Sequence, residues 1–211
     1  MTIDPAERAD ELLIDDYAAG DALAFRALVE RHHDPLICFL FRMMGDRQAA
    51  EDVFQETFLQ IHQSFDTFDR TRRFKPWLFT IAANKARDAL RKIGRRQMLS
   101  LSSSVDDDGG ASFVDLMEID IPAPSNDLER REQSDLVQHA IDGMTPKLKE
   151  ILLLAYFQKL TYVQIAEATK IPLGTVKSRL HSAVAMFAKK WQEQLEESRA
   201  KRKAAGAGGE D

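Results

Sequence analysis

Apolar side chains recur at helical spacing along most of the chain, and polar caps, prolines and glycines divide this pattern into separate helices. Asp21 is placed to cap a helix that we expect to stop near His33, because the Asp-Pro step that follows disfavours helical geometry. The next helix, LICFLFRMM up to Gly45, is apolar on nearly all sides. It is therefore predicted to form the centre of a first helical core, with Cys38 as a core residue.

A further helix is predicted after Asp46, and it has two contrasting faces. Its apolar residues form one stripe, which consists of Phe54, Phe58, Ile61 and Phe65. Its polar residues Asp52, Gln55 and Glu56 share another face. Such an acidic face is normally only a solvated surface, so a binding role for it depends on the rest of the chain.

Residues 75–96 are predicted to form a basic helix that begins at Lys75-Pro76. We expect its inward face to consist of Leu78, Ala82, Ala86, Ala89 and Ile93. Asn84, Arg87 and Arg91 fall on a different face, at spacings of three and four. An Asn side chain can hydrogen-bond a base edge, and arginines can hold phosphates.

The aromatic residues Phe68 and Phe74 lie just before that helix and Trp77 lies in its first turn, and they could offer stacking surfaces to unpaired bases. Core packing is the alternative role, and it is the one we expect for Trp77 and Phe79 taken individually. A strand-opening site needs both a polar face and a stacking surface, because a flipped base loses its neighbours in the duplex.

Residues 160–187, LTYVQIAEATKIPLGTVKSRLHSAVAMF, have the pattern of a helix-turn-helix. Thr161 and Gln164 have the spacing of a capping box, and the first helix is expected to bury Val163, Ile165 and Ala166. The second helix should begin near Thr175. Its apolar stripe is Val176, Leu180, Val184, Phe187 and Trp191, and its polar side offers Lys177, Ser178, Arg179, His181 and Ser182.

In a helix-turn-helix the start of the second helix enters the major groove of DNA, so the polar side chains just named lie where base and phosphate contacts are made. A structural helical hairpin with a solvated face is the alternative. The turn sequence and the cap together favour DNA binding. The remaining helices of this part of the chain are predicted at residues 128–141 and, after Thr145-Pro146, in KLKEILLLAYFQK.

The net charge of −5 is unusual for a nucleic-acid-binding protein, but the charge is unevenly distributed. Residues 66–96 carry ten Lys or Arg against three Asp, which gives +7, whereas residues 97–135 carry −8. The segment 97–126 is rich in Ser, Asp, Gly and Pro and is predicted to be a flexible linker. The single cysteine rules out an internal disulfide, and no apolar run is long enough to span a membrane, so we expect a soluble, cytoplasmic protein.

Three segments together carry a family resemblance: AEDVFQETFLQ, FKPWLFTIAANKARDALRK and LTYVQIAEATKIPLGTVKSRLH, in that order across an acidic linker. In this combination the chain resembles bacterial RNA polymerase sigma factors of the extracytoplasmic-function group of the sigma-70 family. The expected fold is all-α, with two small helical domains joined by a flexible acidic linker, the second containing the helix-turn-helix. The expected boundaries are residues 1–20 for an N-terminal extension in which 9–17 can form a short polar helix, 21–96 for sigma region 2, 97–126 for the linker, 127–195 for sigma region 4 and 196–211 for a disordered tail.

The resemblance implies a role for each polar surface. Region 2 would bind core RNA polymerase and contact the melted minus-ten element, and region 4 would bind the minus-thirty-five element as duplex. The implied residues are Asp52, Gln55 and Glu56 for polymerase, Phe68, Arg72, Arg73, Lys75, Asn84, Arg87 and Arg91 for the minus-ten strand, and Thr175, Lys177, Ser178, Arg179 and His181 for the minus-thirty-five duplex.

The implied partners are core RNA polymerase, promoter DNA and an anti-sigma factor of the kind that holds many relatives inactive. No covalent step, cofactor, metal site or membrane insertion is expected, and the free protein is expected to be a monomer. One departure from the family pattern is that Ser182-Ala183-Val184-Ala185-Met186 follows GTVKSRLH where an arginine-rich sequence is usual. Weak binding to duplex DNA by the free protein is therefore predicted.

Two other functions are alternatives to the sigma-factor interpretation. A stand-alone regulator would bind duplex DNA through the helix-turn-helix, and it predicts a dimer and a pseudo-palindromic site. An enzyme acting on nucleic acid would need a catalytic constellation. The sequence contains no phosphate-cradling glycine loop, nucleophile motif or metal-ligand cluster, so this second alternative is disfavoured.

Overall fold

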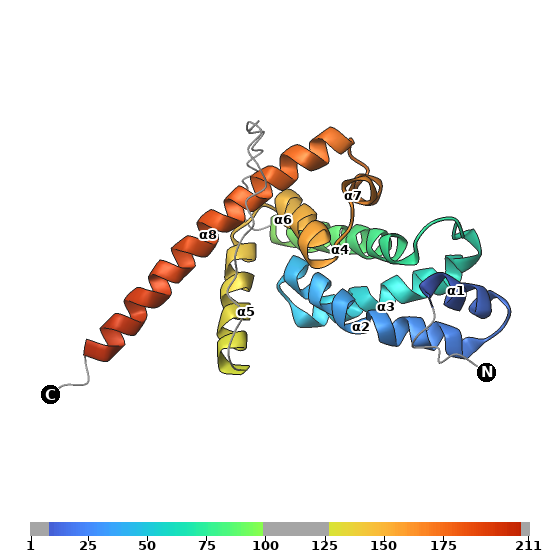
Figure 1. Ribbon diagram of the computed structural model, residues 1–211, viewed down its shortest axis with the longest axis horizontal. Coiled ribbons are helices and arrows are strands. Elements are labelled where there is room, and N and C mark those ends of the chain that lie inside the picture. The colour runs from blue at the N-terminus through green and yellow to red at the C-terminus, as the bar shows by residue number, and fades with distance from the viewer. Residues whose placement is uncertain (1–8, 99–126, 208–211) are drawn as a thin grey trace. The chain divides into compact units, whose positions relative to one another are not determined.

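The computed structural model describes residues 9–98 and 127–207, and every regular element within these two ranges is helical (Figure 1). This confirms the predicted all-α class. The described chain separates into two compact units, one formed by residues 9–98 and 153–173 and the other by residues 127–152 and 174–207. Most of the expected linker, 97–126, lies outside the described residues.

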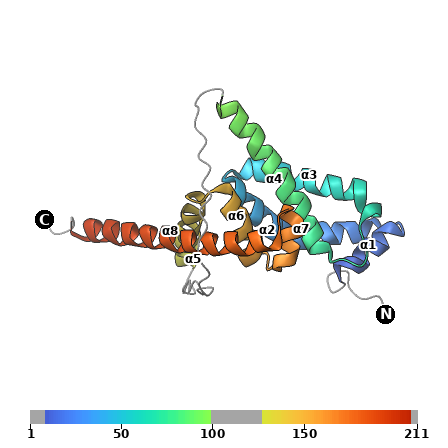
Figure 2. The same ribbon diagram turned by 90° about the horizontal axis from the view of Figure 1, so that it is seen from above.

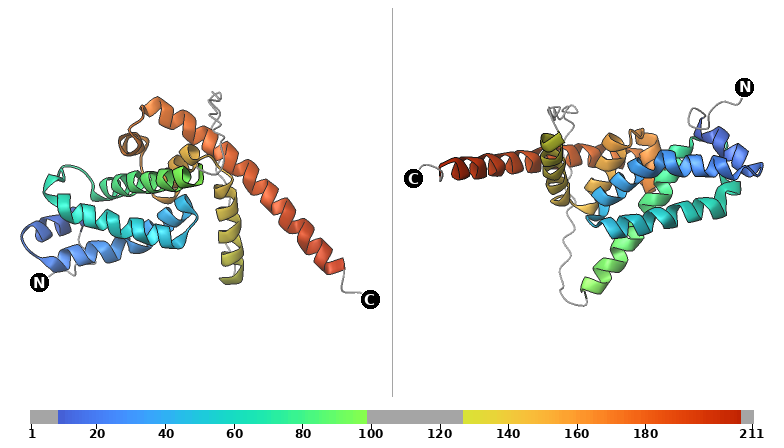
Figure 3. Two further views of the ribbon diagram at one scale, coloured as in Figure 1. Left: turned by 180° about the vertical axis from the view of Figure 1, so that it is seen from behind. Right: turned by 90° about the horizontal axis from the view of Figure 1, so that it is seen from below.

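The first unit is built around helices α1 (Asp10–Ala18), α2 (Ala22–Met44), α3 (Arg47–Ser64) and α4 (Phe74–Met98). A 3-10 turn, η2 (Phe65–Thr67), follows α3 directly. Helices α2 and α3 lie side by side and α4 crosses them (Figures 1 and 2). Helix α1 packs against α2 and also contacts η2 and α4, so it closes the end of the bundle where α3 connects to α4 (Figure 3).

Helices α2 and α3 begin at predicted caps. The Asp21 carboxylate accepts a hydrogen bond from the backbone N–H of Leu23 at 2.9 Å, and the Asp46 carboxylate accepts one from Ala49 at 2.7 Å. Each bond satisfies an N–H group that has no partner within the helix. Gly45 ends α2 with a φ of 74°, a left-handed conformation that glycine adopts without steric cost.

The predicted break between two helices at Pro35 is wrong, because α2 continues through this residue. Pro35 is exposed, so the carbonyl group that loses its helical partner lies on a side that water can reach. His32 before the proline and Leu36 after it are both buried. Tertiary packing on either side therefore holds the helix together across the proline.

The core of the first unit forms where the second half of α2 meets α4. Leu36, Phe39 and Leu40 are fully buried, as predicted for the centre of the core. The Phe39 ring meets the Phe79 ring of α4 edge to face, with centroids 5.3 Å apart. Cys38 is instead exposed, which corrects its predicted place in the core, and its Sγ accepts a hydrogen bond from Arg42 Nε at 3.4 Å.

The inward face of α4 is shorter than predicted. Leu78, Ala82 and Ala86 are fully buried, whereas Ala89 is half-buried and Ile93 is 40% exposed. The small side chains in the first half allow α4 to approach its neighbours closely. Beyond Ala86 the helix leaves the core, which is why the apolar pattern stops predicting burial there.

The second half of the chain contains α5 (Asp127–Asp142), α6 (Pro146–Leu152), the π-helical segment η3 (Leu153–Phe157), α7 (Tyr162–Thr169) and α8 (Leu173–Ala207). The division into units places η3 and α7 with the first unit, because α7 contacts α4, and α8 with the second. Helix α8 begins two residues earlier than expected. It also extends through most of the expected disordered tail, whose Glu, Lys, Arg and Ala residues favour helix.

The second unit has a core formed by α5, α6 and α8. Helix α5 buries Val137, Ala140 and Ile141, and α8 buries the predicted stripe of Val176, Leu180, Val184, Phe187 and Trp191. The last two of these rings are stacked, with centroids 6.2 Å apart. At Gly143 a side chain would meet the aliphatic stem of Lys190 at 3.1 Å, so α8 passes close to the turn after α5.

Among the described residues, no helix is both long enough and apolar enough to cross a membrane.

Candidate nucleic-acid and partner interfaces

One polar face of α4 carries the three residues that the sequence predicted for strand binding. Asn84 and Arg87 are half-buried and Arg91 is exposed. The Arg87 guanidinium donates hydrogen bonds to the Asn84 side-chain oxygen and, at 3.4 Å, to the Ala83 carbonyl. Arg91 pairs with Asp88 at 3.0 Å. The face combines an amide with two cations, which are groups able to contact a base edge and phosphates.

The loop that joins η2 to α4, residues 68–73, has an ordered turn at its centre. The Asp69 carboxylate accepts hydrogen bonds from the Thr71 backbone at 3.0 Å and from the Thr71 hydroxyl at 2.7 Å. These bonds lower the pKa of Asp69 below its usual value, with a smaller contribution from the nearby charge of Arg72. The side chains of Arg72 and Arg73 are 60% and 78% exposed, so this loop presents cations to solvent beside α4.

The aromatic residues near the loop lie mainly inside the bundle. Phe68 is 4% exposed and Phe74 is fully buried, so neither ring has a face available to a base in this structure. The predicted role of Phe68 in minus-ten DNA binding does not agree with this burial. Trp77 is half-buried, and its ring centroid lies 4.8 Å from that of Phe68. Three large rings meet at the start of α4, so in this structure they pack against one another, and those of Phe68 and Phe74 are not open to a base.

Lys75, also predicted for the minus-ten strand, is half-buried at the start of α4. Burial lowers the pKa of its ammonium group, and the negative charge of Asp10 partly opposes this effect. Its Nζ lies 5.9 Å from the centroid of the Phe79 ring. Lys75 is therefore partly engaged with the bundle, in contrast to the exposed arginines of the loop.

The acidic face of α3 is exposed as predicted, with Asp52, Gln55 and Glu56 all open to solvent. Glu56 pairs with Lys85 of α4 at 3.6 Å. Leu59, one turn further along the same face, is 55% exposed and was not identified from the sequence. Its spacing of seven residues from Asp52 was the available signal. An apolar side chain among carboxylates gives this face a contact suited to a protein partner.

The start of α8 presents its predicted polar residues over a buried stripe. Lys177 and Ser178 are exposed, and Thr175, Arg179 and His181 are half-buried. Val176 and Leu180 on the opposite side are buried and fix the rotation of the helix. Because Lys177 and Ser178 lie within the first two turns, the helix start is the most accessible part of this polar surface.

Helix α7 has the predicted capping box. The Thr161 hydroxyl accepts from the Gln164 backbone at 3.3 Å, and the Gln164 side chain accepts from the Thr161 backbone at 2.9 Å. Ile165 is buried as predicted, Ala166 is half-buried, and Val163 is 56% exposed, which corrects its place on the inward face. Ala168 and Thr169 are buried instead, so the buried face of α7 consists of Ile165 and these two residues near its end.

Comparisons with known proteins assign the two halves of the chain to one family. Residues 28–96 match the family described as Sigma-70 region 2, and residues 134–186 match Sigma-70, region 4. The chain is 32% identical over 162 residues to the ECF RNA polymerase sigma factor SigW of Bacillus subtilis, which covers 77% of this chain and 86% of that protein. It is 31% identical over 194 residues to the RNA polymerase sigma-H factor of Pseudomonas aeruginosa, covering 91% and 98%.

The fold is also similar to that of a solved structure, the sigma factor RpoE of Bartonella quintana in complex with the anti-sigma factor NepR. The TM-score is 0.59 at 23% identity, and the similarity covers 82% of this chain and 96% of the solved one. The family matches, the relatives and the all-α fold agree with one another. The chain belongs to the extracytoplasmic-function group of the sigma-70 family, whose members bind core RNA polymerase and promoter DNA and so direct transcription initiation.

Proposed function

We propose that the two halves of this sigma factor read the two promoter elements in different forms. In this proposal region 2 binds the minus-ten element as a melted non-template strand, and region 4 binds the minus-thirty-five element as duplex. The observation that carries the proposal is the polar face of α4, where Asn84 and Arg87 form a hydrogen-bonded pair on the helix that follows an exposed arginine loop. An unpaired base needs such a hydrogen-bonding group next to phosphate contacts.

The proposed strand-binding surface consists of Arg72, Arg73, Asn84, Arg87 and Arg91, with Lys75 as a partly buried contributor. Phe68 is left out because its ring is in the core. The proposed duplex-binding surface consists of Thr175, Lys177, Ser178, Arg179 and His181 on α8. Lys177 and Ser178 are placed for the first contacts because they are the exposed members of this set.

We assign polymerase binding to the face of α3 formed by Asp52, Gln55, Glu56 and the newly identified Leu59. The exposure of all four residues supports this assignment. The face is separate from the strand-binding surface, although Glu56 contacts Lys85 of α4. Polymerase binding and strand binding can therefore be changed one at a time.

The experiment that tests the proposal mixes the protein with bacterial core RNA polymerase and follows co-elution by gel filtration. The holoenzyme is then added to promoter DNA that carries 2-aminopurine at the minus-ten element. Co-elution and a rise in fluorescence, which reports unstacked bases, are expected. A protein that elutes apart from polymerase as a dimer, and that shifts duplex DNA by itself, would support the stand-alone regulator instead.

An anti-sigma factor is a further proposed partner. The Bartonella quintana protein was solved in such a complex, and the present chain shares its fold. Co-expression with a candidate anti-sigma protein should give a complex that excludes core RNA polymerase. Simultaneous binding of both would contradict an inhibitory role for that candidate.

A further inference from the structure

Helix α1 lies before the part of the chain that matches the family, which begins at residue 28. It is nevertheless packed into the first unit, since Leu13 and Ile14 are 1% and 0% exposed. Two carboxylates of α1, Glu11 and Asp15, contact the connection between α3 and α4. The helix therefore belongs to the bundle that carries the proposed strand-binding surface.

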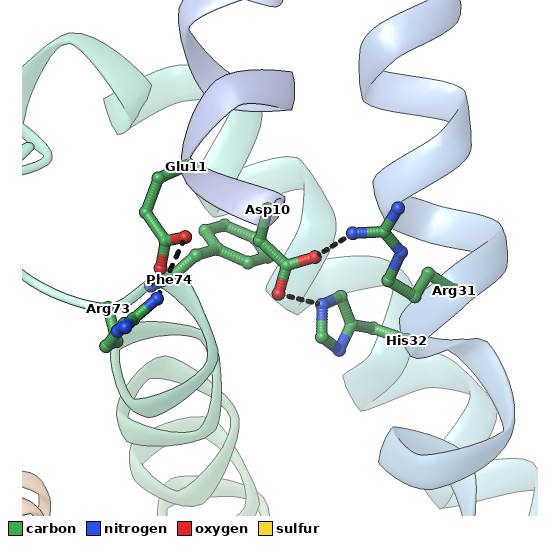
Figure 4. A network of polar contacts seen from close by, with 6 residues as sticks. All are labelled: Asp10, Glu11, Arg31, His32, Arg73 and Phe74. Atoms are coloured by element: carbon green, nitrogen blue, oxygen red, sulfur yellow. Dashed lines mark hydrogen bonds and ion pairs between the residues drawn. The ribbon is translucent and has the colours of Figure 1, made fainter. Parts of the chain in front are cut away.

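The carboxylates of α1 contact the arginine loop, residues 68–73, at two places. Asp15 forms an ion pair with Arg70. At the end of the loop Glu11 accepts a hydrogen bond from the backbone N–H of Phe74 at 3.0 Å and pairs with Arg73 at 3.7 Å (Figure 4). The turn in which Asp69 accepts from Thr71 orders the loop between these places. All three anchors together restrict where the loop arginines can lie.

Asp10 holds α1 in register on α2. Its two carboxylate oxygens contact Arg31 at 2.5 Å and His32 at 2.9 Å (Figure 4). His32 is buried, so this contact is fixed within the bundle. Glu11, the next residue, is thereby directed toward the start of α4.

The bond from Phe74 to Glu11 is the stronger of the two Glu11 contacts. Phe74 is the first residue of α4, where backbone N–H groups lack helical partners and the helix dipole favours a negative charge. The Arg73 side chain is 78% exposed, so its ion pair with Glu11 is weakened by solvent. Glu11 therefore acts as an N-terminal cap supplied by a different helix, and it fixes the point at which the loop ends and α4 begins.

We propose that Glu11 is a positioning residue for strand binding, which caps α4 and so fixes Arg72 and Arg73 at the start of the helix that carries Asn84. The inference rests on the proposed function of this surface. The alternative role for α1 is competition, in which its carboxylates compete with DNA phosphates for the loop arginines. Positioning predicts weaker strand binding when Glu11 is removed, whereas competition predicts tighter binding.

The test measures binding of a fluorescent single-stranded minus-ten oligonucleotide to the reconstituted holoenzyme by anisotropy. For Glu11→Ala the Kd should rise about tenfold, as the loss of a helix cap implies. Glu11→Gln keeps an oxygen that can accept from Phe74 and should restore most of the affinity. Asp15→Asn, a change at an exposed side chain, should raise the Kd about threefold.

The matched control is Glu30→Ala, which removes an exposed carboxylate of α2 that pairs with Arg26 and does not contact the loop. It should bind like the wild type, and all variants should co-elute with core polymerase. Unchanged or tighter binding by Glu11→Ala, or no rescue by Glu11→Gln, would overturn the inference. If the wild-type holoenzyme itself failed to bind the oligonucleotide, the proposed function would be wrong and the inference with it.

Discussion

The Arg87 guanidinium donates a hydrogen bond to the side-chain oxygen of Asn84, one turn earlier on α4. This bond fixes the orientation of the Asn84 amide and holds the arginine over the same face. The two residues should therefore act as a unit in strand binding. Asn84→Ala, Arg87→Ala and the double variant should show a coupling of about 1 kcal/mol, as residues in direct contact do.

The measurement for this pair is a double-mutant cycle on the affinity of the holoenzyme for a single-stranded minus-ten oligonucleotide. Lys92→Ala, at an exposed cation further along α4, provides a control that should add independently to Asn84→Ala. If the losses of binding free energy in Asn84→Ala and Arg87→Ala were strictly additive, the hydrogen bond between the two side chains would not persist in the complex with DNA.

Charge reversal should separate polymerase binding from promoter opening. Arg87→Glu is expected to reduce opening at least tenfold, because a carboxylate repels the strand, while co-elution with core polymerase is retained. Asp52→Lys should instead reduce co-elution with core polymerase, since it changes the exposed face of α3. Gel filtration and 2-aminopurine fluorescence measure the two activities. An equal loss of both in Arg87→Glu would contradict the division of surfaces.

Duplex binding by the free protein is expected to be weak and to depend on few phosphate contacts. Ala183 and Val184 are buried and Ala185 is exposed, so this turn of α8 offers no cation. Lys177→Ala should lower the slope of log K against log salt by about 0.9 if Lys177 contacts one phosphate. Lys189→Ala, at an exposed residue three turns further on, is the matched control. A tight gel shift on duplex promoter without polymerase would refute the prediction.

The contribution of Asp10 to stability should depend on pH. Burial alone would raise its pKa, but the hydrogen bonds and charges of His32 and Arg31 together lower the pKa of Asp10 below the usual 3.8. The stabilisation is therefore present above about pH 4 and is lost as the pH falls through the lowered pKa. At pH 7, Asp10→Asn should reduce the free energy of unfolding by about 1.5–3 kcal/mol, the range for a hydrogen bond to a charged group.

Chemical unfolding of the wild type and Asp10→Asn at pH 7 and at pH 3 measures this difference. The difference in the free energy of unfolding between the two proteins should be smaller at pH 3 than at pH 7. An equal difference at the two pH values would mean that the charge of Asp10 does not contribute to stability. Asp34→Asn, at a fully solvated carboxylate of α2, is the control and should leave stability nearly unchanged.

The features predicted correctly from sequence are those decided by neighbouring residues. The caps at Asp21, Asp46 and Thr161 are confirmed because each needs only a short polar side chain within reach of a free N–H group. The polar spacing along α4 and the buried stripe of α8 are also local properties. For this reason the individual residues of the polar face of α4 and of the buried stripe of α8 could be predicted.

The wrong predictions share a different cause. Helix α2 continues through Pro35 because residues on both sides are anchored in the core, and no local rule contains that information. Cys38 and Val163 were assigned to the interior from apolar neighbours, but the rotation of each helix against its partners decided otherwise. The burial of Phe68 was also not predicted, since it depends on packing against Phe74 and Trp77; its role in DNA binding stays a prediction.

The role of α1 could not be predicted, because its carboxylates contact residues more than fifty positions away. Its polar sequence indicated only a short solvated helix. The signal that was available is Leu13-Ile14, an apolar pair within an acidic segment.

The burial of that pair has a practical consequence for dissecting the protein. A fragment that starts at residue 28, where the family similarity begins, would lack both α1 and residues 22–27 of α2. The apolar surface that Leu13 and Ile14 cover in the intact bundle, where α1 contacts α2 and α4, would face water. Newly exposed apolar surface promotes self-association. The solubility of an isolated region 2 therefore depends on a segment that family boundaries omit.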